Sequence, residues 1–309
     1  MDCLLSRPGM RARLVDGNAM ADNVCEEVSS EISKMTALGR RAPNLTVVLV
    51  GDDPASHTYV KKKQNTAKRC RMSAQTIRKP SSISQEELLQ LIDSLNCDPT
   101  VDGLLVQLPL PNHINESAIC NAISPEKDVD GFNQINIGKY SSGYDIGFIP
   151  ATPLGILEIL KRCHINTFGQ NVCIVGRSKH IGFPLATLLH SDKKYSELCG
   201  DATVTVCHRY TPADQLVAMT RHADIVISAT GVTGLIKGDM IKPGAAIIDV
   251  GLTKVLLPCG KSKLMGDVDF DSACQVASLL TPVPGGVGPM TVAMLMKNTL
   301  EAAQRRSRS

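Results

Sequence analysis

The chain is 309 residues long, about twice the size of a typical domain, and its 43% apolar and 20% charged residues exclude the disordered and fibrous classes. Its 33 basic and 30 acidic residues leave a net charge of +3, too small for the electrostatic footprint of a nucleic-acid-binding protein, and aromatic residues make up only 3%. No run approaches the roughly 18 consecutive apolar residues of a membrane-spanning helix, so we expect neither a nucleic-acid nor a membrane partner.

The N-terminal segment, residues 1–13, is basic, with Arg7, Arg11 and Arg13 against a single acid, Asp2. This composition is typical of a mitochondrial presequence or its remnant. A frayed basic tail, like the one at residues 305–308, is the alternative interpretation.

The first half of the chain predicts alternating helices and strands. A helix follows Met20, because apolar residues recur at helical spacing, and a buried strand is predicted at 45–50. Ser84 and Glu87 form a capping-box pattern that opens a helix, and an apolar strand follows at 101–108. Both strands are too apolar for a sheet with one face in water, so we expect a parallel sheet covered on both faces.

The second half predicts a doubly wound nucleotide-binding sheet. Thr152 and Pro153 have the N-cap and first-turn pattern of a helix start, which places a domain boundary between residues 150 and 151. Four short apolar strands follow, mostly separated by helical stretches, at 172–176, 202–207, 224–230 and 245–251. We therefore expect two α/β domains flanking a cleft: residues 1–150, with a helix at 290–309 packing back on them, and a Rossmann-like domain at 151–289.

The first predicted strand of the second domain ends in a glycine-punctuated turn, residues 176–184, that opens a helix. The N–H groups of such a helix start favour a phosphate, although a plain strand-to-helix turn is the alternative. Arg209 follows the next strand, where an NADP enzyme places a base on the extra phosphate. Arg177 and Asp201 are expected nearby, so the group would instead hold a free phosphate bridged by a divalent ion, or form only a surface salt bridge.

The first domain carries its own candidate residues. Tyr59 and Lys63 are four apart, hence on one face of a helix, within a basic run at 61–71 that is either a solvated face or an attractor for a polyanionic substrate tail. Gln107 ends a buried strand, where ligands lie in parallel sheets. The segments 128–131 and 282–289 are turns, and the prolines and glycines of the second suit close approach to a ligand.

The eleven cysteines include no Cys-x-x-Cys pair. A disulfide framework or a structural zinc site needs closer spacing, so we expect free thiols in a reducing compartment.

Five motifs together resemble the methylenetetrahydrofolate dehydrogenase/cyclohydrolase family, in its order and spacing. They are Tyr-Val-x-x-Lys at 59–63, Val-Gln-Leu-Pro-Leu-Pro at 106–111, Lys-Asp-Val-Asp-Gly-Phe at 127–132, Gly-Arg-Ser at 176–178, and Thr-Pro-Val-Pro-Gly-Gly-Val-Gly-Pro-Met-Thr at 281–291. The similarity extends from about residue 43 to residue 299. It implies an enzyme that oxidises 5,10-methylenetetrahydrofolate to the methenyl form with a nicotinamide cofactor, then hydrolyses that cation to 10-formyltetrahydrofolate.

The resemblance also implies roles for particular residues. Lys63 is the key catalytic amine, Gln107 hydrogen-bonds and tunes it, Tyr59 packs on the folate rings, and Asp130 anchors the pterin. Other residues are implied to line the folate site: Val60, Lys61, Lys62, Val106, Leu108, Pro284, Gly285, Gly286, Val287 and Gly288. The implied substrates are one-carbon derivatives of tetrahydrofolate, polyglutamylated, and the implied assembly is a homodimer.

On the nucleotide side, the resemblance is to the mitochondrial bifunctional subgroup, which uses NAD with Mg²⁺ and inorganic phosphate. Implied cofactor-binding residues are Gly176, Arg177, Ser178, Arg209, Ala229, Thr230 and Gly231. Arg177 and Arg209 would bind the phosphate, and Asp201 the metal. We therefore expect NAD as the cofactor, with NADP used at lower efficiency, and a mitochondrial location with the cytoplasm as the alternative.

Two rival functions remain open from the sequence. The first is a monofunctional dehydrogenase in which Lys63 only orients the folate; the second is a non-enzymatic nucleotide-sensing or RNA-binding module that uses the basic run at 61–71. The hydrolytic step of the bifunctional enzyme needs a group that takes a proton from water, and the residue type at Lys63 fits this need. An amine does so near neutral pH where burial or a cationic substrate lowers its pKa, whereas an arginine holds its proton too tightly.

Overall fold

The computed structural model describes residues 4–5, 12–143, 146–256, 260 and 262–306. Most of the proposed presequence, residues 1–3 and 6–11, lies outside this range. The chain divides into two compact units: unit 1 is Met1–Ala21 with Thr152–Thr291, and unit 2 is Asp22–Ala151 with Val292–Ser309. Among the described residues, no helix combines the length and apolarity that crossing a bilayer would take.

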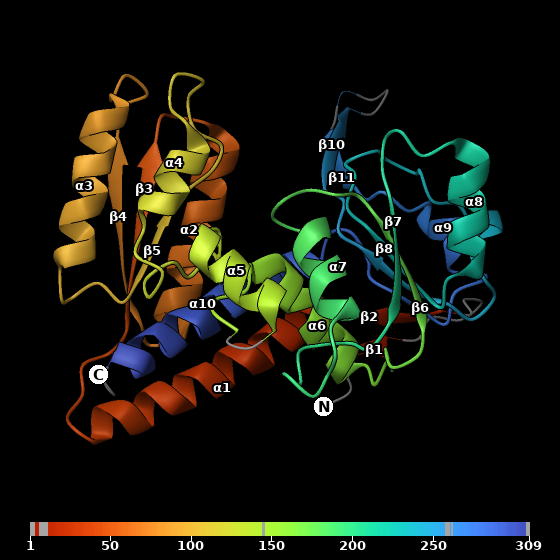
Figure 1. Ribbon diagram of the computed structural model, residues 1–309, viewed down its shortest axis with the longest axis horizontal. Coiled ribbons are helices and arrows are strands. Elements are labelled where there is room, and N and C mark those ends of the chain that lie inside the picture. The colour runs from red at the N-terminus through yellow and green to blue at the C-terminus, as the bar shows by residue number, and fades with distance from the viewer. Residues whose placement is uncertain (1–3, 6–11, 144–145, 257–259, 261, 307–309) are drawn as a thin grey trace. The chain divides into compact units, whose positions relative to one another are not determined.

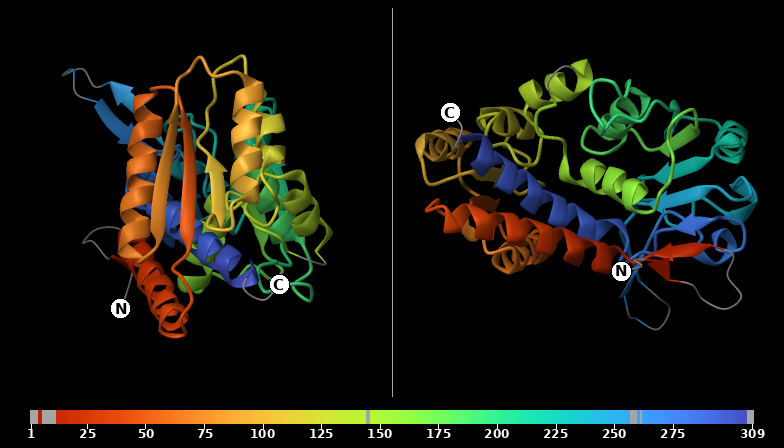
Figure 2. Two further views of the ribbon diagram at one scale, coloured as in Figure 1. Left: turned by 90° about the vertical axis from the view of Figure 1, so that its left-hand side faces the viewer. Right: turned by 90° about the horizontal axis from the view of Figure 1, so that it is seen from below.

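Unit 2 is built on a three-stranded parallel sheet. Its strand order is β4 (Ser73–Lys79), β3 (Asn44–Val50) and β5 (Gly103–Val106). The sheet lies between α2 (Pro54–Arg69) and α3 (Gln85–Cys97), as the left view of Figure 2 shows. The covered parallel sheet predicted from the sequence is therefore confirmed, with β5 shorter than expected.

The start of α3 shows how the sequence sets an element in place. Ser84 Oγ accepts the Glu87 N–H at 3.1 Å, and Glu87 Oε2 accepts the Ser84 N–H at 2.9 Å, so the predicted capping box is present. Leu88 and Ile92 then face a core cluster that also contains Leu104 of β5. Two shorter helices follow in this unit, α4 (Glu116–Ala122) and α5 (Gln134–Ser142).

Two long helices, α1 (Gly17–Ala37) and α10 (Val287–Arg306), contribute residues 22–37 and 292–306 to unit 2, where they run side by side in Figures 1 and 2. Asn298 of α10 donates hydrogen bonds to the carbonyls of Val129 and Ile149, at 2.8 and 3.0 Å. Gly103 of β5 lies beneath this helix, where an added Cβ would be 3.2 Å from the Thr299 side chain. The last helix thus holds β5 and the segment after α4 together.

Unit 1 contains a seven-stranded sheet that is parallel except for its first pair. The order is β1 (Leu4–Leu5), β2 (Arg13–Val15), β12 (Leu279–Leu280), β9 (Ala246–Asp249), β8 (Ile225–Ser228), β6 (Asn171–Val175) and β7 (Thr203–Cys207). Its helices are α6 (Ala151–Arg162), α7 (Gly182–His190), α8 (Ala213–His222) and α9 (Phe270–Ala273), with a 3₁₀ turn at Gly238–Met240; β10 (Thr253–Leu256) and β11 (Ser262–Met265) form a separate antiparallel pair. The doubly wound Rossmann-like sheet is confirmed.

Two details of this unit differ from the expectations. Helix α6 begins at Ala151, so Thr152 lies inside the first turn and is not the N-cap. Strand β2 pairs with β12, which places residues 13–15 in the nucleotide-type sheet although we expected the first domain to begin at residue 1. A strand of only three residues carries too little periodicity to be recognised, and its partner lies far away in the sequence. Every described cysteine is a free thiol, as predicted.

Candidate active site

Helix α2 presents Tyr59 and Lys63 one turn apart, as their spacing predicted. The helix begins with Pro54 in its first turn, and the Asp53 carboxylate accepts the Ser56 N–H at 2.7 Å as the N-cap. Val60 is buried and fixes this face of α2 against the rest of unit 2. Tyr59 remains 40% exposed, so its ring is available to pack against a ligand.

Lys63 and Gln107 meet at the carboxyl end of β5. Lys63 Nζ donates a hydrogen bond to Gln107 Oε1 at 3.1 Å. Gln107 is itself fixed twice, because its backbone N–H donates to the Val48 carbonyl at 2.9 Å and its Nε2 donates to the Leu108 carbonyl at 2.8 Å. Because Nε2 donates to the Leu108 carbonyl, the amide oxygen of Gln107 is the atom that faces Lys63. The side chain therefore holds an acceptor against the amine.

Asp130 lies on a turn beside the same strand end. It lines a narrow hollow together with Val106 and Phe132. The neighbouring Asp128 is buried and its carboxylate accepts the Asn133 N–H, at 2.8 Å, and the Asn136 amide, at 2.9 Å. Burial raises the pKa of Asp128 to about 6. Asp128 is a support for the turn that sequence reasoning did not single out.

The basic residues before Lys63 face solvent. Lys61 and Lys62 are exposed on α2, and Lys62 Nζ is 6.0 Å from the centre of the Tyr59 ring. Further along the helix, Arg69 donates to the Asp22 carboxylate at 2.6 Å, a largely exposed ion pair. The part of the basic run nearest Lys63 is thus free to meet an anion, whereas Arg69 has an acidic partner in the protein.

In unit 1, Gly176 and Ala229 meet at the point where the strand order reverses. From β6 the chain moves to β7 on one side, and then crosses to β8 on the other side of β6. Gly176 follows β6 with φ +127°, and a Cβ there would be 2.4 Å from the Ala229 carbonyl oxygen. Dinucleotides bind at such a switch point, outside the carboxyl ends of the strands.

Ser178 changes the expected phosphate cradle. Its hydroxyl accepts the N–H of Ile181 at 3.2 Å and its carbonyl accepts the N–H of Phe183 at 3.0 Å, while Pro184 has no N–H. The Gly182 N–H, the first of α7, also donates to the Ser178 hydroxyl at 3.4 Å, so Ser178 already satisfies the first N–H groups of the helix. A phosphate near this turn would depend on side chains more than on the helix start.

The two predicted phosphate-binding arginines lie at this same end of the sheet. Arg177 directly follows Gly176, and Arg209 follows the end of β7; both are exposed. The Arg177 guanidinium carbon is 5.7 Å from the ring centre of Tyr210, the neighbour of Arg209. The structure thus brings Arg177 to the segment that carries Arg209.

Asp201 does not join them, contrary to the expectation. It precedes β7, whereas Arg209 follows it, and the strand between spans about 13 Å at 3.3 Å per residue. The Asp201 carboxylate accepts the Lys193 N–H at 3.0 Å, and its backbone is left-handed, with φ +47°. Across the part of the chain that the structure describes, no three His, Cys, Asp or Glu residues are grouped as a metal site. The residues present do not fit a Mg²⁺ ion bridging Asp201 to a phosphate on the arginines.

The turn after β8 is held by Asp267, a residue that sequence reasoning missed. Asp267 is fully buried, and its carboxylate accepts hydrogen bonds from the Ser228 hydroxyl, the Thr230 N–H and the Gly231 N–H. The sequence does carry one signal for it: Asp267 stands between Gly266 and the apolar Val268. An acid in such surroundings is unusual unless it is paired or binds a ligand.

The predicted folate-loop residues lie in unit 1, and some of them are helical. Val287 and Gly288 belong to the first turn of α10, while Gly285 has φ +105°. Gly17 of α1 packs so closely on the Gly286 carbonyl that a Cβ would overlap it. The segment is therefore a tight turn against the start of α1.

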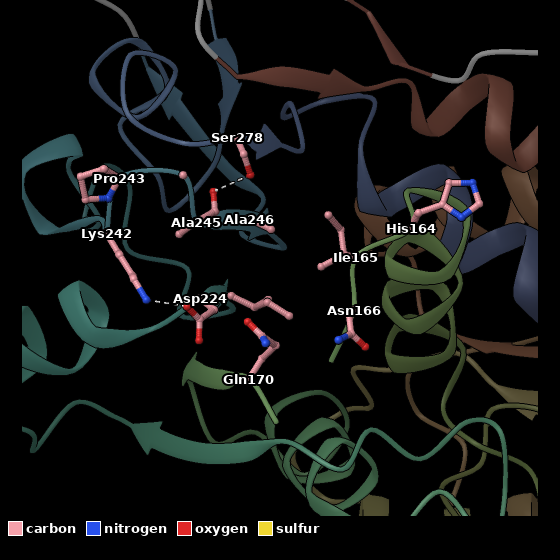
Figure 3. Close-up of a pocket in the computed structure, with 12 residues that line it drawn as sticks. His164, Ile165, Asn166, Gln170, Asp224, Lys242, Pro243, Ala245, Ala246 and Ser278 are labelled. Atoms are coloured by element: carbon pink, nitrogen blue, oxygen red, sulfur yellow. Dashed lines mark hydrogen bonds and ion pairs between the residues drawn. The ribbon is translucent and has the colours of Figure 1, made fainter. Parts of the chain in front are cut away.

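A pocket of about 290 Å³ lies at the other end of the unit 1 sheet (Figure 3). Gln170, Asp224 and Ala245 line it, directly before β6, β8 and β9, and the Lys242 amine is 2.6 Å from the Asp224 carboxylate. None of the predicted site residues lines this pocket. It is distinct from the strand ends at which dinucleotides bind.

Comparison with known proteins decides the family. Residues 15–130 match the catalytic domain of tetrahydrofolate dehydrogenase/cyclohydrolase, and residues 150–307 match its NAD(P)-binding domain. The chain belongs to the tetrahydrofolate dehydrogenase/cyclohydrolase family. The resemblance read from the five motifs is confirmed.

Several members of this family are similar to this chain over most of their own length. The mitochondrial bifunctional methylenetetrahydrofolate dehydrogenase/cyclohydrolase of Gallus gallus is 53% identical over 97% of this chain and 89% of its own. The mitochondrial enzyme of Drosophila melanogaster is 52% identical over 95% of both chains. The names of these relatives agree with the predicted mitochondrial location.

Solved structures agree in fold. The 5,10-methylenetetrahydrofolate dehydrogenase of Bombyx mori is 51% identical, covers 96% of this chain and 100% of its own, and has a TM-score of 0.91. The Trypanosoma brucei dehydrogenase-cyclohydrolase, solved with NADP and an inhibitor, is 37% identical over 96% of this chain and 99% of its own, with a TM-score of 0.89.

Proposed function

We propose that this chain oxidises 5,10-methylenetetrahydrofolate to the methenyl form with NAD, and hydrolyses the methenyl cation to 10-formyltetrahydrofolate. The observation that carries the proposal is the contact between Lys63 Nζ and Gln107 Oε1 at a strand end, in a chain that also has the dinucleotide switch point at Gly176. The bifunctional names of relatives more than 50% identical support both activities.

The hydrolytic step assigns Lys63 the handling of a proton. Water adds to the electrophilic methenyl carbon and loses a proton, which Lys63 takes at Nζ. The C–N5 bond of the adduct then breaks as the hydroxyl loses its proton and N5 gains one, which leaves the formyl group on N10, and the proton on Lys63 passes to solvent. Gln107 Oε1, which accepts from that amine, orients it and keeps one N–H directed away from the reacting water. Tyr59 offers a half-exposed ring on which the folate packs, and Asp130 a carboxylate for the donor groups of the pterin.

NAD supplies the hydride acceptor for the oxidation. Gly176, Ala229, Thr230 and Gly231 surround the switch point and would hold the dinucleotide there. Arg177 and Arg209 would hold inorganic phosphate where an NADP enzyme binds the 2′-phosphate, because guanidinium groups bind such oxyanions in a bidentate manner. Asp201 would take no part in holding that phosphate, because it lies at the other end of β7.

The basic face of α2 supports a polyglutamylated substrate. Lys61 and Lys62 are exposed next to the Tyr59 ring, so a folate packed on that ring would direct its glutamate carboxylates toward them. Attraction between these charges is local, since the chain as a whole carries only +3. We further propose a mitochondrial location and a homodimer, as the family resemblance implies.

A steady-state assay with methylenetetrahydrofolate tests the proposal. NAD and NADP are compared with and without phosphate and Mg²⁺, and hydrolysis of methenyltetrahydrofolate is measured without nucleotide. We expect both activities, with NAD turnover falling at least tenfold when phosphate is omitted and with this dependence weakened in Arg209→Ala. Arg221→Ala, an exposed arginine of the same unit, is the control. Oxidation without hydrolysis would identify a monofunctional dehydrogenase, and equal NAD turnover with and without phosphate would exclude the phosphate site.

A further inference from the structure

Asp267 carries an arrangement that the catalytic roles above do not use. Its side chain is fully buried, and all three of its recorded side-chain donors come from one short segment: Ser228 Oγ at 3.0 Å, Thr230 N at 2.6 Å and Gly231 N at 3.0 Å. A carboxylate is an acceptor only, and two backbone amides with one hydroxyl match it. The turn after β8 is therefore wrapped around the buried Asp267 side chain.

A second buried carboxylate fixes Asp267 in turn. Asp249 accepts the backbone N–H groups of Gly251, Asp267 and Val268 at 2.9 to 3.0 Å. Gly251 packs so closely on the Asp267 carboxylate that any side chain there would overlap it. Several contacts thus hold Asp267 in place at once, so its carboxylate has little freedom to follow a displaced turn.

The hydrogen bonds to Asp267 also decide what the turn presents outward. Because the N–H groups of Thr230 and Gly231 point at the carboxylate, they do not bind a ligand phosphate. The Ala229 carbonyl oxygen is packed against Gly176 at the switch point. Any shift of the 228–231 turn would therefore move the surface that packs against Gly176 and that would contact a bound dinucleotide.

We propose that Asp267 is a positioning residue for the dinucleotide: it sets the 228–231 turn so that the surface at the switch point fits the nicotinamide cofactor, without touching the cofactor itself. This inference rests on the proposed function, since the same end of the sheet must be the cofactor site. It leaves phosphate binding to the arginines, because the Thr230 and Gly231 N–H groups of the turn donate to Asp267.

The decisive variant is Asp267→Asn, which keeps the shape and replaces one acceptor oxygen by an NH₂ group that faces an N–H or O–H donor. We expect the dissociation constant for NAD, and KM for NAD, to rise at least tenfold with a smaller change in kcat. Methenyl hydrolysis without nucleotide should stay within twofold of the wild type. Asp239→Asn, an exposed acid of the same unit, is the matched control and should change neither quantity.

A purely structural role would give a different pattern. If Asp267→Asn lowered both activities in parallel, or left the NAD dissociation constant unchanged, the proposal would be overturned. Ser228→Ala removes one donor and keeps both amides, so NAD binding should weaken about twofold to fivefold. If Asp267→Asn does not fold, Ser228→Ala alone decides, and unchanged NAD binding in Ser228→Ala overturns the inference. A wild-type chain without dehydrogenase activity would instead refute the proposed function.

Discussion

Lys63 Nζ lies 3.1 Å from Gln107 Oε1, and the two residues are 44 positions apart in the sequence. The contact exists because β5 is paired with β3 in register, which brings the end of β5 beside the helix that follows β3. An amine and an anchored amide oxygen are thus brought together by sheet pairing, not by a local motif.

Lys63→Arg should abolish most of the hydrolytic activity. The guanidinium fits the same helix face but does not release its proton at neutral pH, so we expect a loss of about 100-fold or more, the usual contribution of a general base. The loss of methenyltetrahydrofolate absorbance, followed without nucleotide and corrected for the buffer rate, measures it. Lys68→Arg on the exposed side of α2 serves as the control, and full activity in Lys63→Arg would remove Lys63 from the proton step.

Lys62→Glu should reduce the preference for long glutamate tails. Reversing the charge beside Tyr59 repels the tail carboxylates, so the ratio of the KM for the monoglutamate to the KM for the pentaglutamate substrate should fall about fivefold. The difference in this ratio between the wild type and Lys62→Glu should shrink at high salt. Lys68→Glu makes the same charge change six residues further along α2 and should have less effect. An unchanged ratio in Lys62→Glu would mean that the tail lies elsewhere.

The buried carboxyl of Asp128 predicts a pH dependence of stability. Its pKa is raised from 3.8 to about 6, so between these values the folded chain holds a proton that the unfolded chain has lost. The free energy of unfolding therefore falls as pH rises through this window, by up to about 3 kcal/mol. Asp128→Asn lacks the titration, and both donors can reach its amide oxygen, since they share one oxygen of Asp128. Urea unfolding at pH 4 and pH 7 should show this difference; parallel pH profiles would contradict it.

Two glycines should respond in opposite directions to alanine. At Gly103 a Cβ would be 2.9 Å from Val129 Cγ1 and 3.2 Å from Thr299, so Gly103→Ala should lower the free energy of unfolding by about 1–3 kcal/mol. Gly138 lies within α5 with open space around it, so Gly138→Ala should raise stability by about 0.5–1 kcal/mol. Denaturant titration of both variants provides the comparison. Equal stability of the two would refute the packing argument.

The parts of the fold that the sequence predicted are those with local causes. The capping box at Ser84 and the helical spacing of Tyr59 and Lys63 depend on neighbours within one turn, and both are present. The strand β2 pairs with β12, more than two hundred positions away, and Asp267 bonds to a turn some tens of positions away. Neither has a periodic pattern. The misplaced Asp201 has a third cause: a residue before a strand and one after it look adjacent in a motif but lie at opposite ends of that strand.

The pairing of Leu279 with Arg13 has a consequence for dissecting the molecule. A fragment that begins at residue 152 would lack β2, and β12 would become an edge strand with one row of unpaired amides and carbonyls. Such edges promote aggregation between copies. A cut at the apparent midpoint would thus expose this edge, whereas a fusion that supplies residues 12–21 in front of residue 152 would restore the missing neighbour.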